Sequence, residues 1–179
     1  MVAFDRIRSM TLSVPAIPLD PQVVQALSGV STATLTTVLL KHGLRNVWLR
    51  GTRPLAPGQP RLVGRAFTLQ FMPLRPDLDG VINAKAKAAG LDKMYNQVAI
   101  DMLQPGDVLV VDLFGQAEGG TIVGDNLFYY VMKATKGAGL VVDGAIRDLE
   151  GIATMDMPAY FRHAHPSPIG NVIISGINI

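Results

Sequence analysis

Two continuous apolar runs, with a glycine-rich loop and a helical pattern between them, constrain the fold of this chain most strongly. The first run, residues 108–111, follows the turn Pro105-Gly106-Asp107, and the second run is residues 140–142. Apolar strands without polar alternation are typical of a sheet that is covered on both faces. Between the runs lie the loop GQAEGGTIVG and a predicted helix from about residue 125 to residue 136. This order of strand, loop, helix and strand predicts a layered α/β domain.

Two helices are predicted earlier in the chain. Asp20-Pro21 supplies a carboxylate cap followed by a proline at the first helical position, and Gly29 ends this helix. Ser31-Thr32 begins a second helix, which Gly43 ends. We expect three leucines of the second helix to face inward: Leu35, Leu39 and Leu40.

Further strands flank this central pattern. Residues 63–71 are predicted to form a strand that Pro73, Pro76 and two aspartates close, and residues 81–103 are mostly helical with a break at Gly90. The last segment, NVIISGINI, is also predicted to be a strand. Because its backbone groups need partners, either a neighbouring strand or subunit covers it, or the natural sequence continues beyond it.

Length and composition favour a single domain over residues 1–179, with an irregular arm at about residues 1–19. The absence of cysteine excludes disulfides, zinc–thiolate sites and cysteine nucleophiles. The net charge is +2, no basic run resembles a nucleic-acid arm, and no apolar run has the length of a signal peptide or a membrane span. We expect a cytoplasmic protein without membrane or direct nucleic-acid binding.

Residues 124–127 form the first candidate binding loop, where the glycine-rich segment enters the predicted helix. The free amide groups and the dipole of a helix N-terminus favour an anion such as a substrate carboxylate. The alternative is that Asp125 only caps its own helix, and for this loop taken alone the capping role is favoured. The candidate substrate-binding residues are Gly124, Asp125, Asn126 and Leu127.

Residues 143–148 form the second candidate loop, directly after the second apolar run. Ligand sites of open α/β sheets tend to lie beyond the carboxyl ends of the strands. Arg147 is suited to hold a carboxylate or a developing enolate oxygen, and Asp148 to bind a hard cation such as Mg²⁺. A surface ion pair with a helix cap is the alternative, and it is favoured for an isolated Arg-Asp pair.

Taken together, the segments resemble the RraA-like superfamily. The core signature is GDNLFYYVMKATKGAGLVVDGAIRD, and STATLTTVLLKHG, GTRPLAPGQPRLVGRAFTLQF, PGDVLVVD and DMPAYFR match other blocks of the family. The resemblance implies an α/β fold of the layered β/β/α swivelling type. It also implies one of two activities: metal-dependent aldolases act on 4-hydroxy-4-methyl-2-oxoglutarate and decarboxylate oxaloacetate, whereas regulators of ribonuclease E bind and inhibit that enzyme.

The resemblance also implies roles for individual residues. In the family's enzymes, amides of the glycine-led loop, here residues 124–127, hold the pyruvyl carboxylate. The arginine, here Arg147, stabilises the enolate, and the aspartate, here Asp148, ligates the divalent metal partly through water. Mg²⁺ or Mn²⁺ is the expected cofactor, a 2-oxo acid the expected substrate, and a homotrimer or hexamer with interfacial active sites the expected assembly.

This sequence departs from the aldolase pattern at several points. Gly151 stands where aldolases usually carry an acidic residue, and Glu150 replaces that residue only if the backbone shifts. The spacing from Gly124 to Arg147 is slightly longer than in most members. The family's C-terminal strands are also missing, as they would be if the chain were truncated there. These departures bear on the substrate and on full activity, not on the fold.

Three further groups of residues have possible roles. His163 and His165 would share one side of an extended segment, as a metal pair would, but a polar surface loop explains them more simply. Arg75, Asp77 and Asp79 would form a charged group beside the substrate, or equally a solvated turn. At least one of Tyr129 and Tyr130 is expected in the core or in an interface.

The working hypothesis is therefore a class II pyruvate aldolase and oxaloacetate decarboxylase that uses Arg147 and Asp148. Retro-aldol cleavage needs a base, whereas decarboxylation needs none. The rival hypothesis is a noncatalytic regulator of an RNA-processing ribonuclease, and a third is another 2-oxo acid lyase or hydratase. Gly151 favours the regulator, whereas the intact Gly124, Arg147 and Asp148 favour an enzyme. Loss of turnover in EDTA separates an enzyme from a regulator.

Overall fold

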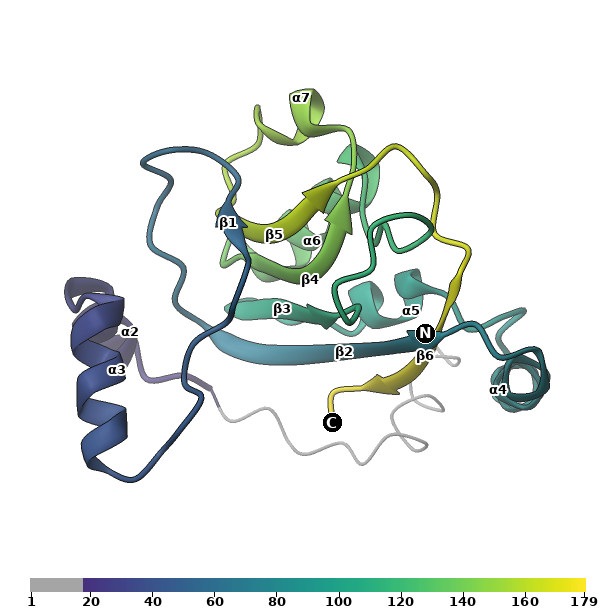
Figure 1. The fold of residues 1–179 in the computed structure, drawn as a ribbon, viewed down its shortest axis with the longest axis horizontal. Coiled ribbons are helices and arrows are strands. Elements are labelled where there is room, and N and C mark those ends of the chain that lie inside the picture. Colours follow the sequence, from purple (N-terminus) through teal and green to yellow (C-terminus); the bar gives the residue numbers. More distant parts are fainter. Residues whose placement is uncertain (1–17) are drawn as a thin grey trace.

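The computed structural model describes residues 18–179, and its strands form one six-stranded sheet in the order β1-β5-β4-β3-β2-β6 (Figure 1). The strands are β1 Arg53–Pro54, β2 Arg65–Pro73, β3 Asp107–Asp112, β4 Leu140–Ile146, β5 Ala159–Ala164 and β6 Val172–Ile177. The helices are α2 Pro21–Gly29, α3 Thr32–Lys41, α4 Pro76–Ala88, α5 Asn96–Asp101, α6 Asp125–Thr135 and α7 Leu149–Ile152. The predicted α/β class is confirmed.

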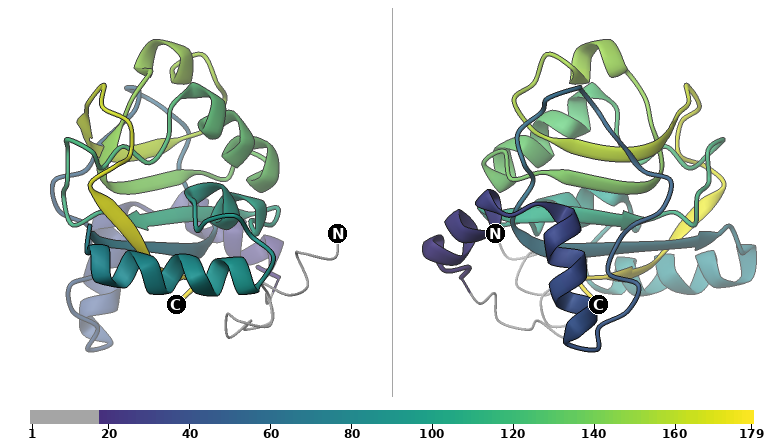
Figure 2. Two further views of the ribbon diagram at one scale, coloured as in Figure 1. Left: turned by 90° about the vertical axis from the view of Figure 1, so that its right-hand side faces the viewer. Right: turned by 60° about the vertical axis from the view of Figure 1, so that its left-hand side comes forward.

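The centre of the sheet is parallel, and the two apolar runs form two of its strands, β3 and β4. β3 pairs with β2 on one side and with β4 on the other, and β4 pairs with β5, all in parallel. The side chains of Leu109, Leu140 and Val142 are fully buried. The helices α5 and α6 pack on one face of the sheet through Val98, Ala99, Phe128 and Val131, and Figure 2 shows α6 on that side.

β4 is longer than predicted, because Gly144 does not end it. A register shift between Val142 and Ala145 carries the strand past the glycine to Ile146. A Cβ at Gly144 would lie 2.6 Å from the Cβ of Leu113, so the glycine allows close packing rather than a chain reversal. Arg147 and Asp148 consequently follow the strand without an intervening loop.

The two N-terminal helices begin where their caps predict, but they are less buried than expected. Asp20 accepts a hydrogen bond from the Gln22 amide, and Ser31 accepts one from the Thr34 amide. Leu35 and Leu39 are half-buried, whereas Leu40 is 43% exposed, so the expectation that it faces inward is wrong. The reason is the placement of α3, which lies at one end of the sheet rather than over it (Figure 1).

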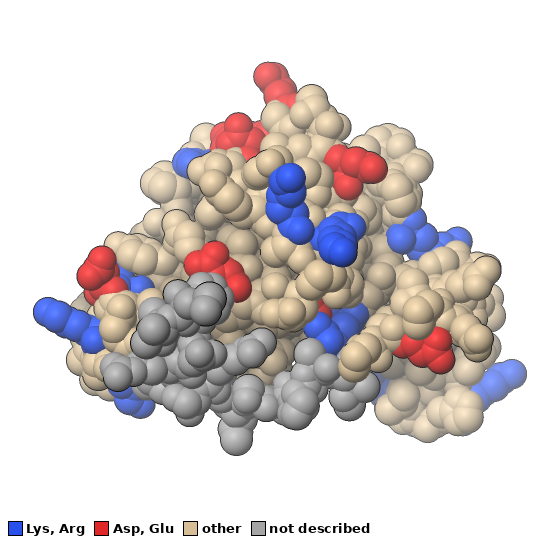
Figure 3. Space-filling view, turned by 180° about the vertical axis from the view of Figure 1, so that it is seen from behind, with Lys and Arg blue, Asp and Glu red and all other residues tan. Residues whose placement is uncertain are grey.

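Among the described residues, no single helix is long and apolar enough to cross a membrane. α2 and α3 meet the length and composition requirement only when joined, and the chain bends by 109° between them. On the face seen in Figure 3, side chains of both charge signs are interspersed over the described surface.

The segment predicted to be helical over residues 81–103 is two helices, and the first begins earlier. Pro76 is the first residue of α4 and Asp77 and Asp79 lie in its first turn, so they begin a helix instead of only closing a strand. Gly90, with φ +86°, follows α4 in a conformation that favours glycine, and α5 begins at Asn96.

The chain's last strand, β6, pairs antiparallel with β2 at the edge of the sheet. The predicted strand is confirmed, and β2 is the neighbouring strand that its backbone requires. The predicted arm lies outside the described residues, apart from Pro18 and Leu19.

Candidate active site at the end of the fourth strand

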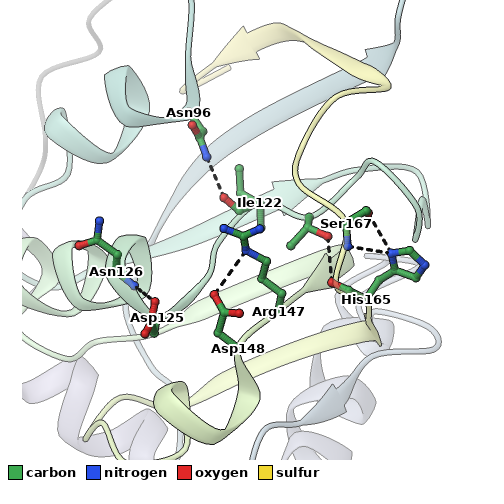
Figure 4. A network of polar contacts seen from close by, with 9 residues as sticks. Asn96, Ile122, Asp125, Asn126, Arg147, Asp148, His165 and Ser167 are labelled. Carbon is green, nitrogen blue, oxygen red and sulfur yellow. Dashed lines mark hydrogen bonds and ion pairs between the residues drawn. The ribbon is translucent and has the colours of Figure 1, made fainter.

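The glycine-rich loop lies directly beside the end of β4. Thr121 forms an isolated parallel bridge with Ala145, and the Ile122 amide donates to the Ala145 carbonyl over 3.2 Å. The Arg147 amide donates to the Val123 carbonyl over 3.1 Å. The structure therefore brings the two predicted loops together, and Figure 4 shows the residues of both.

Gly124 touches the Arg147-Asp148 pair so closely that a side chain there would require the Asp148 carboxylate to move. A Cβ at Gly124 would overlap Oδ2 of Asp148 and would lie 3.1 Å from Nε of Arg147. The φ of Gly124 is −107°, which any residue can adopt, so contact and not backbone strain requires the glycine. The start of α6 and the Asp148 carboxylate therefore form one continuous surface.

Arg147 and Asp148 form an ion pair at this surface. Nε of Arg147 lies 3.3 Å from Oδ2 of Asp148, and the two side chains are 41% and 43% exposed. Exposed pairs of this kind contribute little stability. Asp148 has φ +58°, a left-handed conformation that is uncommon for residues other than glycine and that occurs often at functional sites. The turn from β4 into α7 holds its carboxylate against Gly124.

The first turn of α6 arranges the other predicted binding residues. Gly124 is the cap residue, its carbonyl accepts from the Phe128 amide, and it has no side chain with which to cap the helix. Asp125 is the first helical residue, and its Oδ1 accepts from the Asn126 amide over 2.6 Å. Leu127 is half-buried and packs against the core. Because Asp125 occupies the Asn126 amide, that predicted anion donor is already bonded in this structure.

An acidic group lies beside Gly151, although Gly151 itself is not acidic. A Cβ at Gly151 would lie 3.0 Å from the Cβ of Asp125 and 3.3 Å from its Oδ2. Glu150 is exposed on α7. The Asp125 carboxylate that lies beside position 151 thus comes from a different helix, α6.

The remaining sequence candidates lie elsewhere. His163 is exposed on β5, and Nδ1 of His165 bonds to the hydroxyl and the amide of Ser167. No group of three or more His, Cys, Asp or Glu side chains among residues 18–179 is arranged to hold a metal ion. Tyr129 and Tyr130 are both exposed and meet edge to face, with ring centroids 5.7 Å apart.

The charged group at the start of α4 is a local ion pair. Nη2 of Arg75 lies 2.6 Å from Oδ2 of Asp77, and both side chains are 60% exposed. The hydrogen bond from Arg75 lowers the pKa of Asp77 below its ordinary value. In Figure 1, α4 and α7 lie at different ends of the molecule, so this group is separate from the Arg147-Asp148 surface.

Sequence reasoning missed the residues that hold the glycine-rich loop from its other side. The buried Asn96 donates from Nδ2 to the Ile122 carbonyl over 2.7 Å. Ser167 accepts from the Gly119 amide over 2.7 Å. These contacts join residues 26 and 48 positions apart, so no local sequence pattern indicates them.

The donor set fits a hard divalent cation with few protein ligands. Mg²⁺ binds through one or two carboxylates, keeps several waters and accepts oxygen atoms of the substrate. Asp148 offers a partly exposed carboxylate, and Gly124 leaves the space beside it free of a side chain. A cation held by a larger set of protein ligands does not fit these described residues.

Clefts of the described surface include three of about 520, 320 and 260 Å³, and Arg147 and Asp148 line none of these three. The cleft of about 520 Å³ lies over the sheet between Leu49, Val110, Asp112 and Asp143. We place the candidate active site at the surface formed by Gly124, Arg147 and Asp148 rather than in these clefts. This surface combines complementary charges, a helix N-terminus and a glycine whose Cβ would overlap the Asp148 carboxylate.

Comparison with known proteins identifies a family. The family model described as RraA-like, Aldolase/RraA, matches residues 31–176. The crystal structure of Streptomyces coelicolor RraAS2, described as an unusual member of the RNase ES inhibitor RraA protein family, is 32% identical with a TM-score of 0.73. That match covers 89% of this chain and 73% of the other.

Two further matches are more distant. An uncharacterized protein of Pseudomonas syringae pv. tomato str. DC3000 shares the fold at 23% identity and a TM-score of 0.69, over 91% of this chain and 68% of that one. Protein DlpA of Legionella pneumophila is 27% identical over 140 residues, which are 78% of this chain. The chain spans only 20% of the length of DlpA.

Proposed function

The chain belongs to the RraA-like family, and from that membership we propose that it is a divalent-metal-dependent lyase that acts on 2-oxo acids. The observation that carries the proposal is the contact of Gly124 with Arg147 and Asp148. It joins a helix N-terminus, a guanidinium and a carboxylate at one surface. These are the groups that bind an anionic substrate and stabilise an enolate.

Substrate binding uses the N-terminus of α6 and Arg147. The carboxylate of a 2-oxo acid lies at the first turn of α6, where the helix dipole and the amides other than that of Asn126, which Asp125 occupies, favour negative charge. Arg147 donates to the keto oxygen, which becomes the enolate oxygen. Asp148 fixes the Nε edge of the guanidinium from 3.3 Å away and so orients it.

Asp148 is the residue that would hold the cofactor, Mg²⁺ or Mn²⁺. A cation there supplies electrophilic polarisation of the keto group, which lowers the cost of forming the enolate. Asp148 also neutralises part of the charge of Arg147, so the site balances one guanidinium against one carboxylate before the substrate arrives.

Two reactions pass through the same pyruvate enolate. In oxaloacetate the bond to the distal carboxylate breaks, CO₂ leaves, and protonation of the enolate carbon gives pyruvate. In 4-hydroxy-4-methyl-2-oxoglutarate a base takes the C4 hydroxyl proton, the C3–C4 bond breaks, and its electron pair forms the enolate while the departing half becomes a second pyruvate. Only the second reaction needs a base.

Asp125 is our candidate for this base. Its carboxylate lies beside Gly151, the position at which aldolases of the family usually carry an acid. It is exposed and adjoins Gly124, so a substrate bound at the start of α6 lies next to it. Oδ1 is occupied by the Asn126 amide, so the proton acceptor is Oδ2.

We further propose a homo-oligomer, a trimer or hexamer, whose active sites lie at subunit interfaces. In the single chain the Arg147 and Asp148 side chains are more than two-fifths exposed. Electrostatic catalysis is strongest where water is excluded. A second copy of this chain is the simplest source of the residues that would cover the exposed site and exclude water from it.

The test is pyruvate release from oxaloacetate and from 4-hydroxy-4-methyl-2-oxoglutarate, with Mg²⁺ and with EDTA. We expect metal-dependent turnover that Asp148→Ala abolishes, whereas Glu150→Ala, two residues further on in α7, leaves it intact. No turnover on either compound by a folded, metal-loaded oligomer overturns the proposed lyase activity. A wider panel of 2-oxo acids then tests for another lyase or a hydratase.

A second candidate function is inhibition of an RNase E-type ribonuclease. It is favoured by the 32% identity to RraAS2, which is described as a member of an RNase ES inhibitor family, and by Gly151. The discriminating measurement is ribonuclease inhibition with and without EDTA. Inhibition that is unchanged by EDTA and by Arg147→Ala, in a protein without lyase turnover, supports the regulator over the enzyme.

A further inference from the structure

The peptide chain that leads into Gly124 is held from two sides. On one side the Ile122 amide donates to Ala145 of β4. On the other side the Ile122 carbonyl accepts from Nδ2 of Asn96, the first residue of α5 (Figure 4). The side chains of Ile122 and Val123 are each only 1% exposed, so the segment is fixed in the core immediately before the site.

The chemistry of this contact requires a hydrogen-bond donor on α5, which the Asn96 amide supplies. A carbonyl oxygen only accepts, so the group that faces it must donate. Asn96 is 6% exposed, so little water is available to replace a lost donor. A carboxylate of the same shape would place oxygen against oxygen, and an apolar side chain would leave the Ile122 carbonyl unpaired.

Ile122 is linked to both halves of the site. Arg147 donates its amide to Val123, the next residue, and Gly124 then contacts the Arg147 and Asp148 side chains. A displacement of the Ile122 carbonyl therefore moves the start of α6 relative to the Asp148 carboxylate. Misplacement by about 1 Å is enough to impair a preorganised site severely.

We propose that Asn96 is a positioning residue for the anion-binding end of α6, and this inference rests on the proposed lyase function. Asn96 lies on a different helix and contacts the loop rather than the substrate. It aligns residues 122–124 so that the first turn of α6 and Arg147 engage the same 2-oxo acid. Its loss weakens substrate binding more than metal binding, because Asp148 is anchored by β4 and α7.

The experiment compares Asn96→Asp with the matched variant Asn83→Asp. Asn83, on α4, is half-buried and uses Oδ1 to accept from the Met94 amide over 3.1 Å. A carboxylate preserves an acceptor but not a donor. The same substitution therefore retains the contact at position 83 and destroys it at position 96, while the added charge is equal.

Three measurements are made on the full chain: pyruvate binding in the presence of Mg²⁺ by calorimetry, Mn²⁺ binding by electron paramagnetic resonance, and hydrogen exchange of the amides in residues 119–128. Asn96→Asp is expected to weaken pyruvate binding about tenfold, the effect of one lost hydrogen bond, and to speed exchange in 119–128. Its Mn²⁺ affinity is expected to remain unchanged, and Asn83→Asp to match the wild type in all three.

Unchanged pyruvate affinity and unchanged exchange in folded Asn96→Asp overturn the inference, as does equal weakening by Asn83→Asp. If Asn96→Asp does not fold, Asn96→Ala is measured instead, because it removes the donor without adding charge. If the wild type binds no pyruvate, the lyase proposal fails, and the exchange data alone decide whether Asn96 positions the loop.

Discussion

Asp125 and Gly151 lie against each other across the first turns of two helices, and a Cβ at Gly151 would be 3.3 Å from Oδ2 of Asp125. The Asp125 carboxylate, on α6, thus occupies space that a side chain at position 151, on α7, would otherwise use. The pair explains how position 151 can lack an acid while an acidic group remains beside the Arg147 surface.

The first prediction separates two reactions by changing Asp125. We expect Asp125→Asn to lower retro-aldol turnover by about 10²-fold, the typical contribution of a positioned base, while oxaloacetate decarboxylation stays within a fewfold of the wild type. The measurement is kcat on each substrate. The double variant Asp125→Ala, Gly151→Glu is expected to regain part of the aldol activity. Equal loss of both reactions would show that Asp125 serves binding and not proton transfer.

The second prediction concerns the missing side chain at Gly124. Gly124→Ala places a methyl group on Oδ2 of Asp148 and must displace the carboxylate or the start of α6. We expect kcat/KM to fall by about 10²-fold or more, with weaker Mn²⁺ binding. The control is Gly80→Ala in α4, where nothing lies within 4 Å of the new methyl group. That variant should retain activity and gain slightly in stability.

The third prediction assigns charge stabilisation to Arg147. Arg147→Ala is expected to lower kcat for oxaloacetate decarboxylation by about 10²–10³-fold, because it removes one preorganised donor to the enolate oxygen. Arg75→Ala, at an exposed ion pair on α4, serves as the control. Full activity in a metal-loaded Arg147→Ala protein would contradict the role of this residue.

Local signals predicted the framework of the fold well. The side chains of Asp20 and Ser31 accept hydrogen bonds from amides two and three residues away, so neighbouring residues are enough to predict these caps. The runs at 108–111 and 140–142 form strands whose side chains are mostly buried, as their apolar composition predicts, and the two strands pair in parallel. The contact of Gly124 with Arg147 and Asp148 brings the two candidate loops together.

Features that depend on distant partners were not predictable. Leu40 is apolar and correctly spaced, but the placement of α3 at one end of the sheet decides its exposure. Gly144 is a residue type that is common in turns, yet its close contact with Leu113 keeps it within β4. Asn96 supports Ile122 through one amide-to-carbonyl bond, which leaves no periodic or motif signal.

The fourth prediction concerns the buried carboxylate of Asp107, at the turn into β3. Asp107 is 0% exposed and accepts from Nε of Arg65 over 2.7 Å and from the Gln104 amide over 2.7 Å. Asp107→Ala is expected to lower the free energy of unfolding by about 3 kcal/mol, since it leaves a partly buried guanidinium without this partner. Urea denaturation measures the change, and the exposed Asp92→Ala should alter stability very little.

The last prediction concerns the pKa of Asp77. The hydrogen bond from Arg75 lowers the pKa of this carboxyl in the folded state. The resulting stabilisation is present above the ordinary pKa of an aspartate and is lost as the pH falls through the lower folded-state value. Arg75→Ala should therefore raise the pKa of Asp77, as followed by carboxyl-carbon NMR during an acid titration. Since the pair is exposed, the same variant should leave stability at neutral pH nearly unchanged. An unchanged pKa in Arg75→Ala would show that the start of α4, and not the guanidinium, sets the ionisation of Asp77.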